Sequence, residues 1–328
     1  MTRAAVVGAG GAGAIHADAY SRLEELGVKL VGVCDVVPSK AKDLALKYGA
    51  KWYTDVNELL KDCRPDIVTV STREHQHFEP VIAALEGGAN VLCEKILAHK
   101  VDLARMMVET AEKRRLTLAV NYNYRHLPTV RWLAQELRSG RLGRARLITC
   151  NAHAFGWHHS IDILRYLTGS DPLSVSARLI EKEEERGYPW DYAGEMLYIP
   201  SRAATAAWTF PDDVQAVLSS TRGDLKDFVI HDITVVTDRA RATIADMTTS
   251  NISGRLEVFG VVVPPEHPRC SLADAFHLSI RAVVESLQSG VPPPTSGWDG
   301  LAAMMMEAAV VESNASGGAV AVRPRIPP

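Results

Sequence analysis

Lys95 is the first residue whose position suggests chemistry, because the apolar run Asn90–Cys93 ends in Glu94-Lys95. If this run is a strand of a parallel sheet, Lys95 lies at the carboxyl edge of that sheet, where such sheets bind their ligands. An ammonium group there can hydrogen-bond a substrate hydroxyl and stabilise charge that develops on its oxygen. It can also relay a proton if its pKa is lowered. The alternative is an ordinary exposed lysine that closes a strand.

A second group of reactive side chains consists of His153 and the run His158-His159-Ser160-Ile161-Asp162. Imidazole is the side chain best suited to move a hydroxyl proton near neutral pH. If a helix begins near Ser160, the Asp162 carboxylate can orient or cap the preceding turn. In the alternative interpretation one histidine caps the helix and the other is solvated. A zinc site built from His153, His158 and Asp162 is the weakest interpretation, because the rest of the sequence offers no ligand set. We therefore expect no metal.

The pattern Gly8-x-Gly10-x-x-Gly13 follows the first apolar run and encloses Gly11 and Ala12. Gly8 permits a tight turn, Gly10 lets backbone approach a pyrophosphate, and Gly13 lets a helix pack closely on the sheet. The N-terminus of that helix then offers N–H groups and a positive dipole end to phosphates. Asp35, at the end of the next apolar run, has nearly the spacing expected for an acid that accepts from a ribose hydroxyl. The pattern predicts a dinucleotide site, with a merely structural glycine turn as the alternative.

Two polar stretches follow later strands. The first stretch, Ser71-Thr72-Arg73-Glu74-His75-Gln76-His77, comes after the apolar run that ends at Val70. We expect His77 to form a wall of the cofactor site. Asn121-Tyr122-Asn123-Tyr124-Arg125-His126 leaves the last predicted strand of the first domain and carries many hydrogen-bond donors. It suits the floor of a polyol pocket. A polar hinge between domains is the alternative, with Arg125 in a structural ion pair.

The elements that must position these residues alternate regularly in the first third of the chain. Amphipathic helical patterns lie between short apolar runs, and Gly27, Gly49 and Gly87-Gly88 stand where the helices should end. Such alternation predicts parallel strands with right-handed crossovers, and hence a doubly wound sheet. The predicted strands are Ala4–Gly8, Leu30–Cys34, Asp66–Val70, Asn90–Cys93 and Leu116–Asn121, and the predicted helices are Ile15–Leu26, Ser39–Tyr48, Glu79–Glu86 and Val101–Lys113.

After Asn121 the pattern changes to runs rich in Val, Thr and aromatic residues, many of which alternate apolar with polar side chains. Alternation of this kind predicts a largely antiparallel sheet with one face against helices and one face free for substrate or a partner subunit. We therefore place a Rossmann domain at residues 1–122 and an α+β substrate-binding and oligomerisation domain at residues 123–328. The predicted strands are Leu147–Ala152, Leu173–Leu179, Glu195–Ile199, Ala203–Phe210, Val214–Thr221, Phe228–Thr237, Ala242–Ala245 and Arg255–Phe259, and the predicted helices are Thr129–Arg138, His159–Leu167, Leu272–Leu287 and Gly297–Glu312.

The composition of the 328 residues narrows the class of protein. Hydrophobic residues make up 47% of the chain and argue against large-scale disorder. The formal charge of −3 and the scattered Lys and Arg residues give no basic face for nucleic acid. No apolar run approaches the length of a membrane span, and the first strand begins too early for a signal peptide. Five widely spaced cysteines without a Cys-x-x-Cys pair predict reduced, mostly buried thiols in a cytoplasmic protein.

Together these residues resemble the glucose–fructose oxidoreductase / inositol dehydrogenase / MocA (Gfo/Idh/MocA) family along nearly the whole chain. The segments that carry the resemblance are Gly8-x-Gly10-x-x-Gly13-x-x-His16, Asp35, Thr72 to His77, Val91 to Lys95, Asn123-Tyr124-Arg125, His159-x-x-Asp162 with Tyr166-Leu167-Thr168-Gly169, and Ser296-Gly297-x-Asp299-Gly300. By this resemblance Lys95 corresponds to the lysine of the family's catalytic Glu-Lys-Pro motif and His159 to its substrate-facing histidine. Asp35 would select NAD, although Ser39 and Lys40 leave room for the 2′-phosphate of NADP.

The resemblance and the motifs together imply two sets of binding residues beside the catalytic pair. The expected cofactor-binding residues are Gly8, Gly10, Gly11, Ala12, Gly13, Asp35, Thr72, His77, Glu94, Lys95 and Asn123. The expected substrate-binding residues are Tyr124, Arg125, His158 and Asp162. The family likeness also implies a homodimer or homotetramer.

Three departures from the family pattern point to an altered pocket. Ile96 stands where the family has proline after the lysine, which removes a backbone constraint on the lysine. Phe155 stands four residues before His159, where the family has an acid, and Arg73 stands where a proline is common. His158, Trp157 or Tyr124 could take over the role of the missing acid.

We therefore predict an NAD(P)-dependent oxidoreductase that passes hydride between nicotinamide and a secondary alcohol or ketone of a sugar, cyclitol or amino-sugar-like substrate. Two other classes stay open. A cofactor-binding regulator or scaffold without turnover would account for the changes at Ile96 and Phe155. A hydrolase or lyase that retains NAD and oxidises its substrate only transiently is the third.

Overall fold

The structure is a computed structural model that describes residues 1–153, 156–180, 203–221, 229–248, 250–260 and 262–322. The predicted strand Glu195–Ile199 and Phe155 lie outside these residues. The chain divides into two units. The first unit comprises Met1–Asn123 and Phe276–Leu301, and the second comprises Tyr124–Ala275 and Ala302–Pro328. Each unit is described in turn.

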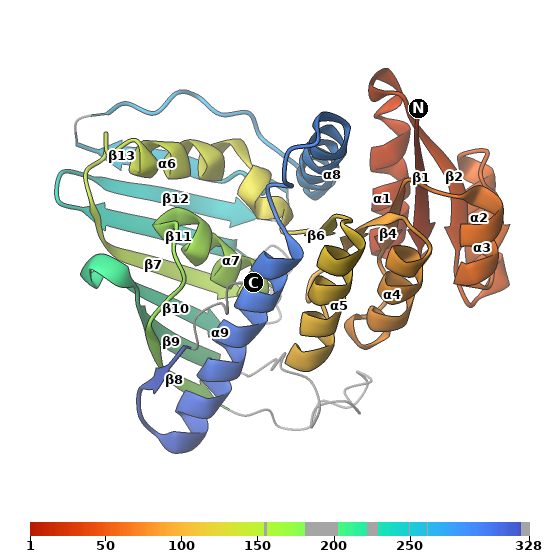
Figure 1. Cartoon of the computed structure of the whole chain (residues 1–328). Coiled ribbons are helices and arrows are strands. Elements are labelled where there is room, and N and C mark those ends of the chain that lie inside the picture. Colours follow the sequence, from red (N-terminus) through yellow and green to blue (C-terminus); the bar gives the residue numbers. More distant parts are fainter. Residues whose placement is uncertain (154–155, 181–202, 222–228, 249, 261, 323–328) are drawn as a thin grey trace. The chain divides into compact units, whose positions relative to one another are not determined.

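The first unit is built on a six-stranded sheet in the order β3-β2-β1-β4-β5-β6 (Figure 1). Every pair of neighbouring strands is parallel, which confirms the predicted doubly wound sheet. The strand order runs outward from β1 in both directions, so ligands are expected outside the carboxyl ends near β1 and β4. The strands are β1 (Thr2–Val7), β2 (Val28–Cys34), β3 (Lys51–Tyr53), β4 (Ile67–Val70), β5 (Asn90–Cys93) and β6 (Leu118–Val120).

Helices cover both faces of this sheet. Val33 belongs to the hydrophobic cluster shared with α1, whereas an added Cβ at neighbouring Gly32 would meet Leu59 and Cys63 of α3. Because successive strand residues point to opposite faces, α1 and α3 lie on opposite sides of β2. The helices are α1 (Gly11–Ser21), α2 (Pro38–Lys47), α3 (Val56–Cys63), α4 (Phe78–Glu86) and α5 (Val101–Arg114), with short 3-10 turns at Glu24–Leu26 and Glu74–Gln76.

The sequence analysis missed two elements of this unit, β3 and α3. The strand β3 has three residues, none of them buried, so it shows no apolar run. Helix α3 does carry a start signal, because the Asp55 side chain accepts from the backbone N–H groups of Asn57 and Glu58 at 2.7 and 3.1 Å. Reading Asp55 as an N-cap would have located this helix.

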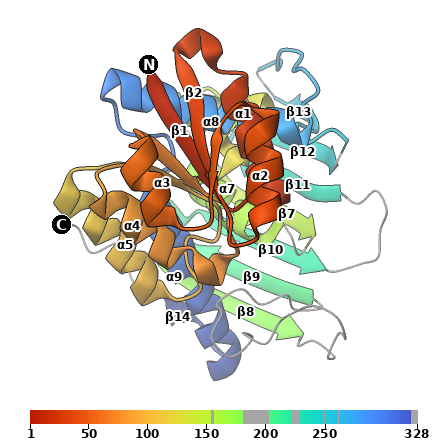
Figure 2. The ribbon, with the colours of Figure 1, turned by 90° about the vertical axis from the view of Figure 1, so that its right-hand side faces the viewer.

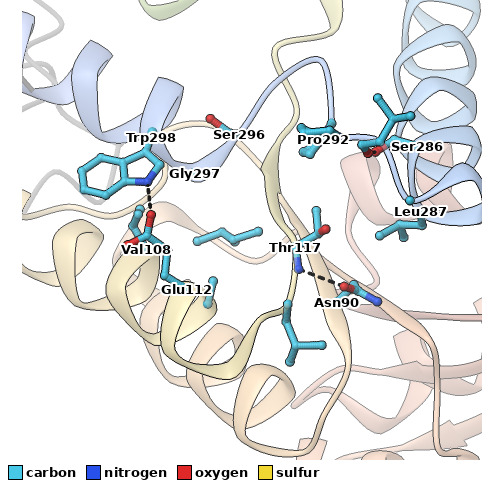
Figure 3. A pocket seen from close by; sticks show the side chains of 16 residues that line it. Asn90, Val108, Glu112, Thr117, Ser286, Leu287, Pro292, Ser296, Gly297 and Trp298 are labelled. Carbon is cyan, nitrogen blue, oxygen red and sulfur yellow. Dashed lines mark hydrogen bonds between the residues drawn. The ribbon is translucent and has the colours of Figure 1, made fainter. Parts of the chain in front are cut away.

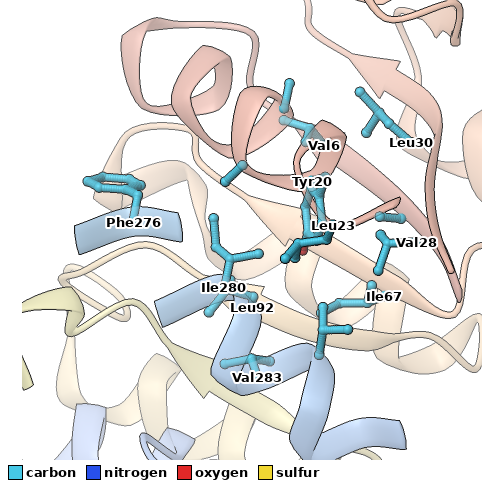
Figure 4. Packing of buried hydrophobic residues seen from close by; sticks show 14 of the residues in the cluster. Val6, Tyr20, Leu23, Val28, Leu30, Ile67, Leu92, Phe276, Ile280 and Val283 are labelled. Carbon is cyan, nitrogen blue, oxygen red and sulfur yellow. The ribbon is translucent and has the colours of Figure 1, made fainter. Parts of the chain in front are cut away.

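Helix α8 (Leu272–Ser289) requires a correction to the predicted domain boundaries. The sequence analysis assigned all residues after 122 to the second domain, but Phe276–Leu301 belong to the first unit. Phe276, Ile280 and Val283 pack in one buried cluster with Tyr20 and Leu23, near the end of α1 (Figure 4). The helical pattern showed that this helix has an apolar face, and the apolar partner of that face could not be read from spacing alone.

The second unit is built on an eight-stranded sheet in the order β13-β12-β11-β7-β10-β9-β8-β14 (Figure 2). The β7–β10 pair is parallel and the other described pairs are antiparallel, so the predicted, largely antiparallel sheet is confirmed. The strands are β7 (Ala145–His153), β8 (Ser174–Ile180), β9 (Ala203–Thr209), β10 (Gln215–Thr221), β11 (Val229–Thr237), β12 (Arg241–Thr248), β13 (Arg255–Phe259) and β14 (Val320–Ala321).

One face of this sheet packs against helices. Helix α7 (Trp157–Thr168) packs on β7 and β10, and α6 (Pro128–Arg138) packs on β12. Helix α9 (Gly297–Ser316) begins in the first unit and reaches β8, where Ser313 Oγ accepts from Ala177 N at 2.9 Å. Short 3-10 turns span Asn123–His126 and Pro211–Asp213.

The other face carries small and uncharged side chains in its middle. Ala207, Val217, Thr149, Thr234 and Thr243 form one cross-strand row from β9 to β12, and each is partly exposed. Within the described residues, no helix is both long and apolar enough to cross a bilayer.

Candidate functional site

The turn between β1 and α1 explains two of the three glycines of the sequence pattern. Gly8 has a φ of +97°, and a Cβ there would lie 2.7 Å from the Ser71 carbonyl carbon. A Cβ on Gly13 would lie 1.8 Å from the Gly8 carbonyl oxygen, which no side-chain movement can relieve. Glycine at these positions therefore lets the chain turn off β1 and lets α1 pack against that turn.

The other glycines of this turn have no such internal reason. A Cβ on Gly10 or Gly11 would meet no described atom within 4 Å, and Gly10 has an extended conformation open to any residue. Both glycines are exposed. They therefore leave room for an outside group to approach the backbone, as the sequence analysis predicted for a pyrophosphate.

Helix α1 presents its N-terminus at this open turn. The first N–H groups of any helix have no intrahelical acceptor, and the helix dipole adds partial positive charge there. The first turn of α1, which includes Ala12, lies wholly within the described residues and carries no acidic side chain. The residues present thus fit an anionic group such as a dinucleotide phosphate.

Asp35 follows β2 and braces the glycine turn. Its Oδ2 accepts from Ala9 N at 2.7 Å and its Oδ1 from Val37 N at 2.8 Å. A carboxylate has about four lone-pair directions, so both oxygens can still accept from a ribose hydroxyl. The two backbone bonds also hold negative charge at a fixed place beside the turn.

Thr72 and His77 shape the loop that follows β4. The buried His77 ring places Nδ1 2.8 Å from Ile96 O and Nε2 3.2 Å from Thr72 O. Burial lowers the pKa of His77 despite its carbonyl partners, so the ring is neutral at pH 7 and donates through one nitrogen. The shorter contact assigns the donated bond to Ile96 O, in the segment after Lys95.

Glu94, directly after β5, is a buried carboxylate with three donors around it. His16 Nε2 donates to Glu94 Oε1 at 2.8 Å, and Asn121 Nδ2 donates to the same oxygen at 2.5 Å. Glu94 Oε2 accepts from Lys95 N at 3.3 Å. Burial raises the pKa of Glu94, but the bonds from His16 and Asn121, with the charge of Lys95, outweigh it and lower this pKa. Glu94 is therefore ionised at neutral pH.

Lys95 lies at the carboxyl edge of the sheet, as the sequence analysis predicted. Its side chain is partly exposed, whereas Glu94 before it and Ile96 after it are buried. The peptide bond between Lys95 and Ile96 is cis. The Lys95 N–H donates to the Glu94 side chain, and the Ile96 carbonyl accepts from His77, so side chains hold the backbone on both sides of the Lys95 Cα.

Asn123 ends the continuous first part of this unit. Its side chain is 1% exposed, and neither its Nδ2 nor its Oδ1 has a hydrogen-bond partner in the described part of the chain. A buried amide without partners is costly, so this side chain suits a ligand that completes its bonds.

The second unit holds the other catalytic candidate, His159, in the first half of α7. The Tyr124 ring stacks on the His159 ring, with centroids 4.0 Å apart and planes 11° apart. The edge of His231, from β11, meets Tyr124 at 5.0 Å and 88°. His231 Nδ1 lies 2.8 Å from Ser160 Oγ, and Ser160 Oγ itself donates to Gly156 O at 3.0 Å. The serine therefore accepts from His231, which fixes the tautomer of that ring.

Arg125 and Asp162, two of the predicted substrate-binding residues, pair with each other. Arg125 Nε donates to Asp162 Oδ2 at 2.7 Å and Nη2 donates to Oδ1 at 2.6 Å, a bidentate arrangement. Their side chains are 8% and 1% exposed. This is the structural ion pair that the sequence analysis left open as the alternative for Arg125. It attaches the segment Tyr124-Arg125 to α7.

His158, the fourth predicted substrate-binding residue, faces an acid that the sequence analysis did not single out. Its Nδ1 lies 3.2 Å from Glu307 Oε2 of α9, and both side chains are at most 2% exposed. His158 and His159 are adjacent on a helix and project about 100° apart. In the described ranges, no three His, Cys, Asp or Glu side chains are grouped to hold a metal.

A cavity of about 470 Å³ in the first unit has none of the predicted site residues in its lining (Figure 3). Asn90 and Leu118, the first residues of β5 and β6, line it, so it opens at the amino edge of the sheet. Its polar groups serve the fold, since Asn90 Oδ1 accepts from Thr117 N at 2.9 Å and Trp298 Nε1 donates to Glu112 at 2.5 Å. We therefore assign the site to the opposite, carboxyl edge.

The sequence analysis did not predict three residues that contact the candidate site residues: His16, His231 and Glu307. His16 stands in the glycine motif, and its spacing from Gly13 was the available signal. Glu307 was detectable as a lone acid inside the apolar run Ala302-Ala303-Met304-Met305-Met306-Glu307-Ala308-Ala309-Val310-Val311 of a helix. His231 lies in an alternating strand, where nothing local distinguishes it from a solvated residue.

Comparison with known proteins adds independent findings. A family model named GFO_IDH_MocA, described as an oxidoreductase family with an NAD-binding Rossmann fold, matches residues 2–122. The D-glucoside 3-dehydrogenase of Escherichia coli K12 is 36% identical over 152 residues, which cover 46% of this chain and 43% of that enzyme. The chain therefore aligns with less than half the length of this relative.

Matches along the whole chain are more distant. The inositol 2-dehydrogenase of Acidothermus cellulolyticus is 28% identical over 341 residues, covering 98% of this chain and 96% of that enzyme. The scyllo-inositol dehydrogenase of Lactobacillus casei, solved with NAD(H) and scyllo-inositol, has a TM-score of 0.78 at 20% identity. That comparison covers 98% of this chain and 99% of the other, and it concerns the fold alone.

Proposed function

We propose that this chain is a member of the Gfo/Idh/MocA oxidoreductase family, whose model matches residues 2–122, and that it is an NAD-dependent dehydrogenase of a sugar, cyclitol or amino-sugar-like substrate. The reaction passes hydride between nicotinamide and a secondary alcohol or ketone. The observation that carries this proposal is the partly exposed Lys95 at the same sheet edge as the open glycine turn. The names of the relatives, D-glucoside 3-dehydrogenase and inositol 2-dehydrogenase, support this substrate class.

The cofactor-binding residues follow from the open turn. Gly10 and Gly11 admit the pyrophosphate, the N-terminus of α1 stabilises its charge, and Asp35 accepts from a ribose hydroxyl. The rest of the proposed cofactor site is lined by Thr72, His77, Glu94 and Asn123. Bound NAD supplies the hydride acceptor or donor.

In the direction of oxidation, the carbon–hydrogen electron pair leaves as hydride and the hydroxyl proton passes to the protein. We assign the proton to His159, whose ring Tyr124 holds by stacking. Lys95 donates a hydrogen bond to the same substrate oxygen and stabilises its developing negative charge. The ion pair of Arg125 and Asp162 positions Tyr124 and α7. Only His159 and Lys95 act on the substrate oxygen.

Chain connectivity supports the pairing of Lys95 with His159. Asn121 donates to Glu94, the neighbour of Lys95, and Tyr124 stacks on His159. Asn121 and Tyr124 are only three residues apart in the sequence, so the chain can extend by at most about 11 Å between them. One short segment thus contacts both Glu94, which precedes Lys95, and His159.

We further propose that NAD is preferred to NADP and that the protein works in a reducing compartment, the cytoplasm. Asp35 keeps its charge fixed beside the turn through the bonds from Ala9 and Val37, and that charge repels a 2′-phosphate. All five cysteines lie within the described residues and are free and buried, which suits reducing conditions.

The test is a kinetic comparison on the substrate that a panel of polyols and keto-sugars identifies with NAD(H) and NADP(H). Lys95→Met and His159→Ala should each lower kcat about 10²- to 10⁴-fold, because each removes a group that acts on the reacting oxygen. NADH affinity, measured by fluorescence titration, should stay close to that of the wild type in His159→Ala. The matched control is Lys113→Met, on the exposed end of α5.

Near-normal turnover in both catalytic variants would refute the assignment of these residues. Wild-type protein that binds NADH but exchanges no hydride with any substrate of the panel would refute the dehydrogenase and favour a cofactor-binding regulator.

A further inference from the structure

His16 is a titratable residue of α1, the helix that follows the glycine turn, and it has no exposed surface. It lies in the same helix whose N-terminus is proposed to receive the pyrophosphate. Its Nε2 meets Glu94 Oε1 at 2.8 Å, across 78 positions of sequence. A carboxylate oxygen only accepts, so His16 Nε2 carries a proton and donates it.

The other contacts of this histidine come from apolar groups. The ring meets Phe276 of α8 edge-on, with centroids 5.2 Å apart, and no described atom accepts from or donates to its Nδ1. The bond to Glu94 is therefore the one hydrogen bond that the described structure gives the ring. A buried imidazole is costly unless it is hydrogen-bonded, so the bond to Glu94 is the interaction that offsets the burial of this ring.

That bond controls the group next to Lys95. Glu94 is 7% exposed, its Oε1 accepts from His16 and Asn121, and its Oε2 faces Lys95 N at 3.3 Å. Without the His16 donor, Asn121 alone would hold Oε1, and the carboxylate could rotate away from the backbone of Lys95. Burial of an under-paired carboxylate would also favour its protonation.

We infer that His16 is a positioning residue for Lys95: through Glu94 it connects the phosphate-binding helix α1 to the lysine at the end of β5. This inference rests on the proposed function of Lys95. His16 touches neither substrate nor cofactor in this role. It holds the Glu94 carboxylate, and the carboxylate holds the backbone and charge of the lysine.

The test compares two substitutions of His16 with one matched control. His16→Gln places an amide N–H near the position of Nε2 and keeps the bond to Glu94, whereas His16→Leu keeps apolar volume without a donor. The control is Tyr20→Phe, which removes another buried bond of α1, from Tyr20 Oη to Thr69 Oγ1 at 2.8 Å. Tyr20 has no contact with Glu94 among the described bonds.

We expect His16→Leu to lower kcat about 10- to 100-fold, the effect of a lost charge-assisted bond, with the Kd for NADH within about threefold of wild type. His16→Gln should recover most of the loss. Tyr20→Phe should leave kcat unchanged even where its Tm falls. An equal loss of kcat in His16→Leu and Tyr20→Phe, or no loss in His16→Leu, would overturn the inference.

A second measurement does not depend on turnover, so it separates this inference from the proposed function. Limited acetylation with acetic anhydride, followed by mass spectrometry, reports the reactivity of the Lys95 amine. The bonds of Glu94 hold the backbone of Lys95 in place, so its amine should label about threefold or more faster in Glu94→Gln and His16→Leu, where that hold is lost, than in wild type and Tyr20→Phe. Equal rates in all four proteins would contradict the positioning role, whatever substrate the enzyme uses.

Discussion

His231 shows how a single buried side chain can set the pH range in which the second unit is stable. The ring is fully buried in β11, and burial lowers its pKa to about 3 from an ordinary value of 6.5. It is therefore neutral in the folded protein at every pH at which enzymes usually work. Its neutral Nδ1–H bond to Ser160 holds it against Tyr124, behind His159.

Acid should destabilise the protein through this residue. Below pH 6.5 the unfolded chain binds a proton at residue 231 and the folded chain does not, so stability present above pH 6.5 is lost as the pH falls toward 3. The loss is about 1.4 kcal/mol per pH unit for one proton. In His231→Asn, whose amide still donates toward Ser160, the slope of unfolding free energy against pH between 6 and 4 should decrease by about that amount.

Urea unfolding followed at several pH values checks this prediction. The difference between wild type and variant should be constant above pH 7, where neither state takes up the proton. Parallel curves below pH 6 would show that His231 does not titrate on unfolding. His126, whose pKa burial also lowers to about 3, contributes a similar slope to both proteins.

At this scale the sequence predicts a residue far better than its partner. Gly8, Gly13 and Lys95 could be placed because a strand, a turn and the start of a helix follow one another within a few positions. Arg125 and Asp162 were both named, but they are 37 positions apart, and their mutual ion pair was only one of two open interpretations. His16 and Glu94, 78 positions apart, have no local pattern that pairs them.

The turn between β1 and α1 makes its glycines experimentally separable. Gly10 has an extended conformation and no described neighbour within 4 Å of an added Cβ, whereas an added Cβ on Gly13 collides with Gly8 O at 1.8 Å. The two glycines belong to one motif, but the structure gives only Gly13 a role in folding.

Alanine substitutions should therefore have different effects on the two properties. Gly10→Ala should fold with an unchanged Tm and bind NADH at least about tenfold more weakly, because its methyl group occupies the space left for the cofactor. Gly13→Ala should lose about 2 kcal/mol or more of stability, because α1 must move off the turn, and should lose NADH binding as well. Thermal unfolding and fluorescence titration of both variants distinguish these effects. A fall in Tm for Gly10→Ala as large as that for Gly13→Ala would contradict the argument.

Element types were predictable wherever periodicity was strong. The strand Asn90–Cys93 and the start of the helix at Val101 match the structure at the residue level, because each has clear apolar spacing and a boundary residue. Helix α8 was also recognised, but its packing in the first unit was not. An amphipathic pattern predicts that one face of a helix is buried, but it does not indicate which element covers that face.

At the scale of the assembled protein, the second sheet has one face that no helix of the described residues covers. A row of uncharged residues crosses its strands, with Val217 opposite both Ala207 and Thr149. We propose that this face joins two copies of the chain, since uncharged β surfaces associate more readily than charged ones.

The substitution Val217→Arg places a charge in the middle of that row and should shift the protein to monomers. Light scattering coupled to size-exclusion chromatography measures the mass directly. Gln135→Arg, on the exposed side of α6 in the same unit, is the matched control and should leave the mass unchanged. A monomeric wild type, or an unaltered mass for Val217→Arg, would show that copies do not meet through this face.

The packing of α8 on α1 has a consequence for biosynthesis. The ribosome releases all six strands of the first sheet long before it releases the helix that completes the cluster around Tyr20 and Leu23. During that interval the nascent chain displays the apolar surface that Ile280 and Val283 later cover. Maturation of the nucleotide half is thus delayed until late in translation, and the exposed surface is a point at which chaperones would engage the emerging polypeptide.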